Sequence, residues 1–152
     1  MIIYASNSDK EIQIDEKDKD ICKYDWRISS IGYVRATING KRWFLHRYLL
    51  KPKEGMQVDH INGNTLDNRR DNLRICSIKE NRRNSKKRKT QSSSKYKGVS
   101  YCSTEKRRKR WKAACEIDNK DIYAGRFYTE EEAKEAYNKK AKELFGEFAK
   151  IN

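Results

Sequence analysis

A run of nine residues without a single apolar side chain, residues 86–94, divides this 152-residue chain into two short segments. The run has nothing to bury, so we interpret it as a basic, serine-rich linker. Hydrophobic residues make up 36% of the whole chain and charged residues 38%. Neither segment can therefore build a large core, and we expect two small α+β domains, residues 1–85 and 95–152, on either side of the linker.

The charge of the chain narrows the class of partner. There are 36 basic residues and 22 acidic ones, which gives a formal net charge of +14, and residues 61–94 alone hold ten basic against three acidic residues. Such a surplus is typical of proteins that bind nucleic acid and less often of proteins at anionic membrane surfaces. Apolar runs are too short to span a bilayer, and residues 1–10 lack the pattern of a secretion signal. We therefore predict a soluble, cytoplasmic protein with no membrane partner.

The cysteine spacing argues against a zinc site. Cys22, Cys76, Cys102 and Cys115 include no C-x-x-C pair, so we expect no zinc. All four fall in short apolar, strand-like runs. We predict reduced, partly buried thiols, as is usual inside cells.

The first segment is predicted to be rich in strands. Residues 21–50 look strand-like, and Asn39-Gly40 predicts a two-residue hairpin turn, because both residues tolerate positive φ. Residues 58–60 and 73–76 are predicted as short strands joined by a long polar turn. A helix is expected to begin near Ser77, with Glu80 completing a capping box. The order is strand, turn, strand, helix.

Residues with catalytic chemistry stand on these last elements. Asp59 offers a carboxylate and Asn81 a carboxamide oxygen, the ligands that hard ions such as Mg²⁺ prefer. His60 has the ordinary pKa of a general base near neutral pH. Adjacent strand residues point to opposite faces, so Asp59 and His60 converge only if the strand bends or the ion lies over its edge. The alternatives are a surface histidine, a turn-capping carboxylate and a solvated helix residue.

The wider pattern around these residues resembles the HNH nucleases of phage and intron-encoded homing endonucleases. The resemblance is carried by residues 58–64, 67–69, 72–74 and Asn81, and extends upstream to residues 45–47. It implies a ββα-metal fold that uses Mg²⁺ or Mn²⁺. His60 would be the general base, Asp59 and Asn81 the metal ligands, and Asn72 a catalytic-motif residue that braces the loop by hydrogen bonds. It also implies a phage- or mobile-element-encoded protein acting in a bacterial cell.

Several further residues near this motif have more than one interpretation. We expect His46, in an apolar run, to be a core or loop-bracing histidine; a phosphate contact or an auxiliary site residue are the alternatives. Arg74, Arg82 and Arg83 are each expected either to steady the scissile phosphate or to lie on a solvated or DNA-backbone-binding face. The basic residues that follow the motif are predicted to track DNA phosphates, unless they belong to a merely solvated linker. They are Arg82, Arg83, Lys86, Lys87 and Arg88.

The second segment is predicted to form a three-stranded antiparallel sheet packed on one helix. The strands are expected at residues 98–101, 110–117 and 122–127, with a tight connection at residues 118–120. Thr129 and Glu132 form the pattern of a capping box, and apolar residues then recur on one helical face up to Phe145, before Gly146. Strand alternation places Trp111 on the core side and Lys112 on the opposite side.

This segment resembles the DNA-binding domain of the plant Apetala-two/ethylene-response class. The matching text is residues 96–99, 111–113, 125–127, 132–137 and 145–152. The resemblance implies a sheet laid in the major groove of double-stranded DNA. Base preference does not carry over, because Ala114 and Glu116 stand where that class has arginines. The expected DNA contacts are Lys97, Arg110, Lys112, Tyr123 and Arg126.

Together these patterns favour a metal-dependent DNA endonuclease of the homing type, targeted by its C-terminal domain and acting as a monomer or weak dimer. One alternative is a non-catalytic, sequence-specific DNA-binding regulator with a decayed nuclease module. Another is a basic nucleoprotein component without specificity.

Overall fold

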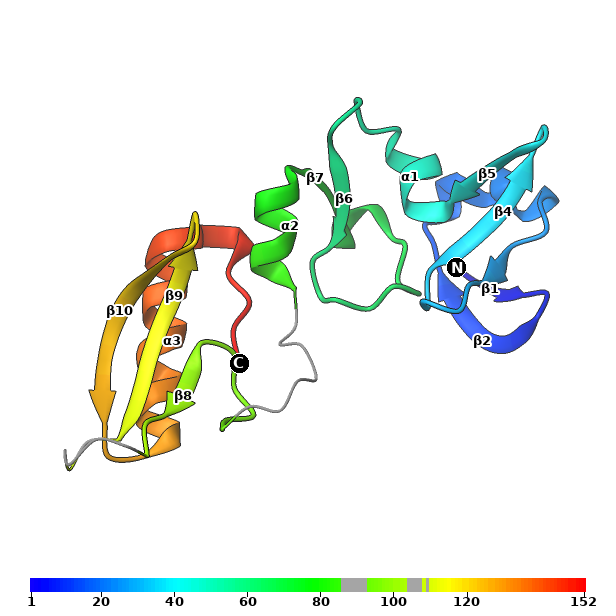
Figure 1. The fold of residues 1–152 in the computed structure, drawn as a ribbon. Coiled ribbons are helices and arrows are strands. Elements are labelled where there is room, and N and C mark those ends of the chain that lie inside the picture. Colours follow the sequence, from blue (N-terminus) through cyan, green and yellow to red (C-terminus); the bar gives the residue numbers. More distant parts are fainter. Residues whose placement is uncertain (86–92, 104–107, 109) are drawn as a thin grey trace. The chain divides into compact units, whose positions relative to one another are not determined.

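The computed structural model describes residues 1–85, 93–103, 108 and 110–152, and the chain forms two compact units, Met1–Arg82 and Arg83–Asn152. In these ranges the strands form four small antiparallel sheets, joined by short helices and one longer one (Figure 1). A mixed α/β architecture with small sheets is therefore confirmed. Lys86, Lys87 and Arg88 of the predicted linker lie outside the described residues. Ser94, at its other end, donates a hydrogen bond to Glu130.

The first unit begins with a hairpin that the sequence analysis did not identify. Strand β1 (Ile2–Ala5) pairs with β2 (Ser8–Gln13), and the 3-10 helix η1 (Glu16–Lys23) follows. Only one residue of β2 is buried, so its sequence lacks the apolar alternation of a strand. Ile12 and the following Ile14 are fully buried and anchor the hairpin in the core. Cys22, predicted to be partly buried in a strand, is instead exposed on η1.

A second sheet contains β3 (Arg27–Ile28), β4 (Val34–Ile38) and β5 (Lys41–Phe44) in that order. The hairpin predicted at Asn39-Gly40 is confirmed: Ile38 pairs with Lys41, and the two turn residues have φ of 51° and 75°. This turn lets β4 and β5 pair directly, because both central residues tolerate the left-handed conformation.

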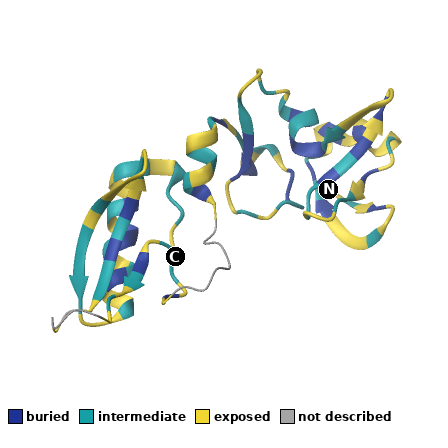
Figure 2. Cartoon of the chain, in the orientation of Figure 1, coloured by how far each residue is buried: buried dark blue, intermediate teal, exposed yellow. Residues whose placement is uncertain are grey.

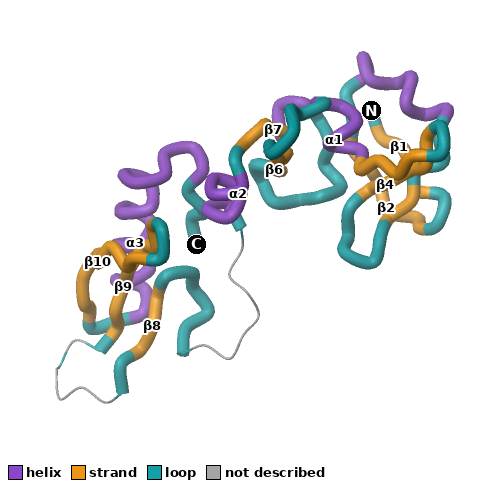
Figure 3. The backbone as a smooth tube through the Cα atoms, turned by 45° about the horizontal axis from the view of Figure 1, so that its top comes forward, coloured by secondary structure: helices purple, strands orange, loops and turns teal. Residues whose placement is uncertain are grey.

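The strand-like interpretation is wrong for the end of residues 21–50. Leu45–Leu50 form helix α1 (Figure 3), which buries Leu45, His46 and Leu49. Leu45 and Leu49 are four residues apart, and residues at this spacing share a face both in a helix and in a strand. The pattern of a short apolar run therefore does not distinguish the two structures. The helix ends at Lys51 in the left-handed conformation, immediately before Pro52.

The last elements of the first unit appear in the predicted order. Strand β6 (Gln57–His60) pairs with β7 (Leu73–Cys76), which follows the 3-10 turn η2 (Arg70–Asn72), and helix α2 (Ile78–Asn84) follows β7. The predicted capping box is confirmed: the Glu80 N–H donates to Ser77 Oγ, and the Ser77 N–H donates to the Glu80 carboxylate. This fixes the start of α2, and Asn81 lies one turn inside it.

The second unit contains β8 (Val99–Tyr101), β9 (Trp111–Ile117) and β10 (Lys120–Phe127), with β9 in the centre. Helix α3 (Glu130–Phe145) packs on one face of this sheet, and the 3-10 turn η3 (Gly146–Phe148) directly follows the helix. The capping box between Thr129 and Glu132 is confirmed. Figure 2 shows the buried residues along β9 and the facing side of α3. The buried core is made of Val99, Ala113, Cys115, Ala133, Tyr137 and Ala141.

Gly98 explains how closely α3 approaches the sheet. Its φ is +70°, and a Cβ at this position would overlap the Tyr137 ring and lie 2.5 Å from the Ala114 carbonyl oxygen. Only glycine combines this backbone conformation with the absence of a side chain. Trp111 packs against the same core, as predicted, with its ring edge-on to Tyr101 at 5.0 Å.

Candidate active site

Asp59 lies in β6 as a buried carboxylate that is paired with an arginine. Its cross-strand partner on β7 is Arg74, and Arg74 donates to Asp59 Oδ2 from Nε at 2.9 Å and from Nη2 at 2.7 Å. Asp59 is 6% exposed, and the Arg74 side chain is 11% exposed. A carboxylate with so little water needs a cation beside it, and in this structure the guanidinium supplies that charge.

Asn81 lies on the same face of β6 as Asp59. Its Nδ2 donates to Gln57 Oε1 at 2.5 Å. Gln57 and Asp59 are two residues apart in β6, so their side chains point to one side of the strand. The fold therefore places the carboxylate and the carboxamide that the sequence analysis assigned as metal ligands on one side of β6, although 22 positions separate them in the chain.

His60 projects from the opposite face and is buried. It is 4% exposed, and its Nε2 lies 3.4 Å from Asn68 Oδ1. Burial lowers its pKa from the ordinary 6.5, while the Asn68 contact and the nearby carboxylates of Asp59 and Asp67 oppose this lowering. At neutral pH the imidazole is consequently uncharged and able to accept a proton.

Two rings lie beside the imidazole of His60, and a third packs on one of them. The His46 ring is edge-on to it at a centroid distance of 5.1 Å, and Tyr33 lies at 6.0 Å. Phe44 stacks on His46 at 5.7 Å with an interplanar angle of 18°. Burial, then the neighbouring His60 and Arg47, lower the pKa of His46 to about 3. His46 is thus a neutral core histidine, which is the first of the interpretations that its sequence left open.

Hydrogen bonds close the loop between β6 and β7. Asn72 accepts the Asn62 N–H at 3.0 Å on Oδ1 and donates from Nδ2 to the Asp67 carbonyl at 2.7 Å. The buried Asp67 carboxylate accepts from Asn62 Nδ2 at 2.9 Å and from the Arg69 guanidinium at 2.8 Å. The Arg69 interaction holds the pKa of Asp67 below its usual range. The loop therefore has one ordered shape.

The N-terminal hairpin supports this loop, and the sequence analysis missed that role. The Gln13 N–H donates to the Leu66 carbonyl at 2.9 Å, and the Asn68 N–H donates to the Gln13 carbonyl at 2.8 Å. Arg70 binds Asp18 through Nε at 2.9 Å and Nη2 at 2.7 Å. These contacts join residues more than fifty positions apart, so no local pattern reveals them.

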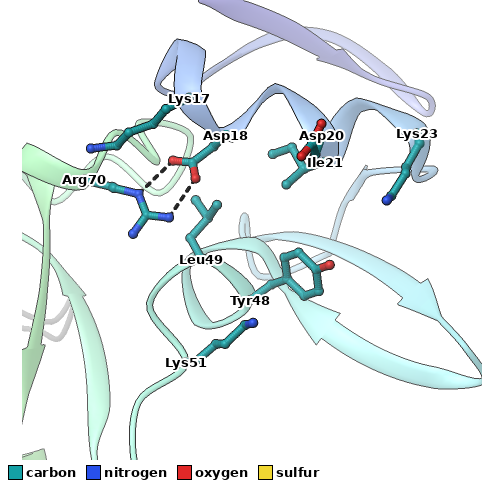
Figure 4. A pocket seen from close by; sticks show the side chains of 9 residues that line it. All are labelled: Lys17, Asp18, Asp20, Ile21, Lys23, Tyr48, Leu49, Lys51 and Arg70. Atoms are coloured by element: carbon teal, nitrogen blue, oxygen red, sulfur yellow. Dashed lines mark hydrogen bonds and ion pairs between the residues drawn. The ribbon is translucent and has the colours of Figure 1, made fainter.

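The same Asp18–Arg70 pair lines a pocket of about 200 Å³ between η1 and α1. Figure 4 shows the guanidinium of Arg70 turned toward the Asp18 carboxylate, with Lys17, Lys23 and Lys51 around the rim. Asp59, His60 and Asn81 do not line this pocket. It is separate from the candidate site.

The donors at Asp59 and Asn81 fit a hard divalent cation in kind. They are one carboxylate and one carboxamide oxygen on one strand face, and Mg²⁺ commonly uses one or two protein oxygens together with water and substrate phosphate. Within the described ranges, no group of three or more His, Cys, Asp and Glu side chains is placed to hold a metal. An ion at Asp59 has to share or displace the hydrogen bonds that Arg74 makes to Oδ2.

The predicted DNA contacts of the second unit fall into two groups. Lys112 pairs with Arg126, and the neighbouring Ala114 pairs with Tyr123, on the sheet face opposite α3. Lys112 also binds Asp121 at 2.9 Å. Arg110 is exposed next to this face and donates to the Tyr101 hydroxyl at 3.2 Å. The structure thus gathers four of the predicted contacts on or beside one surface.

Lys97 and Arg83 are used inside the second unit instead. Lys97 Nζ donates to the carbonyls of Arg83 and Ser85 at 2.7 and 2.8 Å, and burial lowers the pKa of Lys97. The Arg83 guanidinium lies 5.0 Å from the centre of the Phe145 ring. Arg82, by contrast, is exposed on α2. Within the part of the chain that the structure describes, no helix is long and apolar enough to cross a membrane.

Comparisons with known proteins agree with the chemistry of this site. A family model described as HNH endonuclease matches residues 51–83, the segment that holds Asp59, His60, Asn72 and Asn81. The chain is also 35% identical over 138 residues to an HNH endonuclease of Acanthamoeba polyphaga mimivirus, covering 87% of this chain and 68% of the viral protein. Because the first unit ends at Arg82, a match of that length includes part of the second unit. No solved structure matches the chain.

Proposed function

Because this chain belongs to the HNH endonuclease family and is a nuclease that acts on DNA, we propose that it hydrolyses phosphodiester bonds of double-stranded DNA with a divalent cation, Mg²⁺ or Mn²⁺. The observation that carries the proposal is the arrangement on β6. Asp59 and Asn81 lie on one face of the strand, and a neutral histidine, His60, is the last residue of the same strand. Family membership disfavours the alternative of a non-catalytic regulator.

Each residue has a distinct part in the proposed mechanism. Asp59 and Asn81 would hold the cation, which when bound offsets the charge of the phosphate and assists the leaving oxygen. His60 accepts the proton of the attacking water on an imidazole nitrogen. Since His60 is 4% exposed, this role requires its ring to become accessible to water in the DNA complex. Arg74, which donates to Asp59 in this structure, lies beside that carboxylate and would contact the phosphate.

A plasmid cleavage assay with and without a chelator tests the proposal. His60→Ala should abolish cleavage in Mg²⁺ while the affinity for DNA stays within about threefold, because general-base catalysis contributes about 10²–10⁴ in rate. Asp59→Asn retains an oxygen for Arg74 but loses the charge, and should be inactive at moderate Mg²⁺. Cleavage by folded His60→Ala, or wild-type cleavage in excess chelator, would refute the mechanism.

We also propose that the outer face of the β8–β9–β10 sheet binds DNA, in the manner of the Apetala-two/ethylene-response class. Lys112 and Arg126 are adjacent on that face, with Tyr123 in the next row. The double variant Lys112→Ala/Arg126→Ala should weaken binding and lower the slope of log K against log salt by about 2, since each phosphate contact contributes about 0.9. The control Lys139→Ala/Lys142→Ala removes equal charge from exposed positions of α3. Equal losses for the two pairs would refute this surface.

We propose further that the protein is a homing endonuclease, encoded by a phage or other mobile element and active in the cytoplasm of a bacterial host. The viral origin of the relative supports the part of this proposal that concerns a mobile element. One candidate site per chain predicts nicks from a monomer and paired cuts from a dimer. Strand-specific mapping of the ends on a genomic substrate, together with the mass of the protein in solution, distinguishes these outcomes.

A further inference from the structure

One buried side chain next to His60 is not used by the proposed mechanism. Asn68 is 0% exposed and lies eight residues after His60, in the loop between β6 and β7. Its amide is held by two contacts: Nδ2 donates to the Thr65 carbonyl at 3.2 Å, and Oδ1 lies 3.4 Å from His60 Nε2. A fully buried amide with both ends in contact has a fixed orientation.

The Thr65 contact decides which way the amide of Asn68 points. A carbonyl oxygen only accepts hydrogen bonds, so the group that faces Thr65 must be the NH₂ end. The end that faces His60 is therefore the oxygen, which also only accepts. His60 Nε2 must then carry the proton of this hydrogen bond. In the neutral ring the lone pair lies on Nδ1.

The backbone of Asn68 is fixed as firmly as its side chain. Its N–H donates to the Gln13 carbonyl at 2.8 Å, and Gln13 in turn donates to Leu66 at 2.9 Å. The side chain of Asn68 therefore belongs to a segment that β2 holds in place. The neighbouring rings of His46, at 5.1 Å, and Tyr33, at 6.0 Å, limit the rotation of the imidazole.

We propose that Asn68 is a positioning residue that fixes His60 as the Nε2–H tautomer, so that Nδ1 is the nitrogen that accepts the proton from water. The inference rests on the proposed role of His60 as base, but the tautomer itself is a property of the protein without DNA or metal. It also gives the N-terminal hairpin a function, since β2 holds the segment that carries Asn68.

The tautomer can be measured in the full chain by long-range proton–nitrogen correlation of ¹⁵N-histidine-labelled protein at pH 8, without metal. The ordinary pKa of a histidine side chain is about 6.5, so both rings are uncharged at this pH. The chain has two histidines, and His46→Phe assigns the remaining signals to His60. We expect a pyrrole-type shift on Nε2 and a pyridine-type shift on Nδ1. The reverse pattern overturns the proposal whatever the activity of the enzyme.

Substitutions then connect the tautomer to the reaction. Asn68→Leu keeps the volume but removes the acceptor; both His60 tautomers should appear, and kcat should fall by at least ~10-fold with KM within about twofold. Asn68→Asp still presents an acceptor oxygen to His60 Nε2 and should keep the wild-type tautomer. The control Asp71→Asn changes an exposed side chain of η2 in the same loop and should leave tautomer and kcat unchanged.

The outcomes separate this inference from the proposed function. An unchanged tautomer in folded Asn68→Leu overturns the inference, as does an equal loss of kcat in Asp71→Asn. Cleavage by His60→Ala instead refutes the base itself and leaves the tautomer result standing. If Asn68→Leu does not fold, the wild-type and Asn68→Asp spectra still decide the question.

Discussion

The neutral, buried state of His46 leads to a specific prediction about stability and pH. In the unfolded chain His46 titrates near 6.5, and in the folded chain its pKa is about 3. Between these two values the unfolded state binds a proton that the folded state does not. The free energy of unfolding therefore falls as the pH falls below 6.5, and this contribution is fully retained above it.

The size of the effect follows from the two pKa values. Between pH 8 and pH 5 the unfolded His46 takes up nearly a full proton over about 1.5 pH units. At about 1.4 kcal/mol per unit, this costs about 2 kcal/mol of stability. His46→Phe keeps a ring against Phe44 and His60 but cannot be protonated. We expect the variant to lose about 2 kcal/mol less than the parent between pH 8 and pH 5.

Urea unfolding at the two pH values measures this difference. A Trp111→Phe background restricts the tryptophan fluorescence to Trp26 and Trp43, which belong to the first unit. Protonation of His60 changes the free energy of unfolding in the same direction in both proteins, so its contribution cancels when the two are compared. The His46 ring proton shift should also stay constant down to pH 4. Equal pH dependence in the two proteins, or titration of His46 near pH 6, would refute the reasoning.

Three further predictions follow from other contacts. Arg74→Gln removes a cation from Asp59, so Mn²⁺ titrated calorimetrically should bind at least ~10-fold more tightly to the folded variant; weaker binding would show that Arg74 does not compete for the carboxylate. Gly98→Ala should destabilise the second unit by about 2 kcal/mol or more, because its φ is +70° and Tyr137 fills the space of a Cβ; proteolysis of that unit at wild-type rates would contradict this. Asp18→Asn should weaken the clamp on Arg70 and speed hydrogen exchange in residues 61–72, whereas Asp9→Asn, at an exposed position of β2, should not; equal exchange in the two variants would argue against the clamp.

Local signals in the sequence succeeded where a few neighbouring residues determine the geometry. The hairpin at Asn39-Gly40 and the caps at Ser77 and Thr129 formed as predicted, because each depends on backbone conformations or hydrogen bonds within four residues. The same reasoning failed at Leu45–Leu50. A short apolar run fits a buried strand or a buried helix, and packing against the rest of the first unit selects the helix.

The sequence likewise predicts only some of the residues that make up the candidate site. Asp59, His60 and Asn81 can be proposed from residue type and spacing, because proton transfer and cation binding need those functional groups. Their neighbours cannot. Arg74 contacts Asp59 across a strand pair, and Asn68 contacts His60 from the loop between the strands. Gln13, more than fifty positions away in the sequence, holds that loop by backbone hydrogen bonds.

The amino-acid sequence by itself therefore determined that this protein is cationic and carries an acid, an imidazole and an amide in one motif, which resembles that of the HNH nucleases. It did so because functional groups and net charge are properties of composition and order. Only the tertiary structure decided the charge partner of the carboxylate, the burial of both histidines and the nitrogen of His60 that bears the proton. Those properties depend on distances between residues remote in the chain, which exist only after the core has formed.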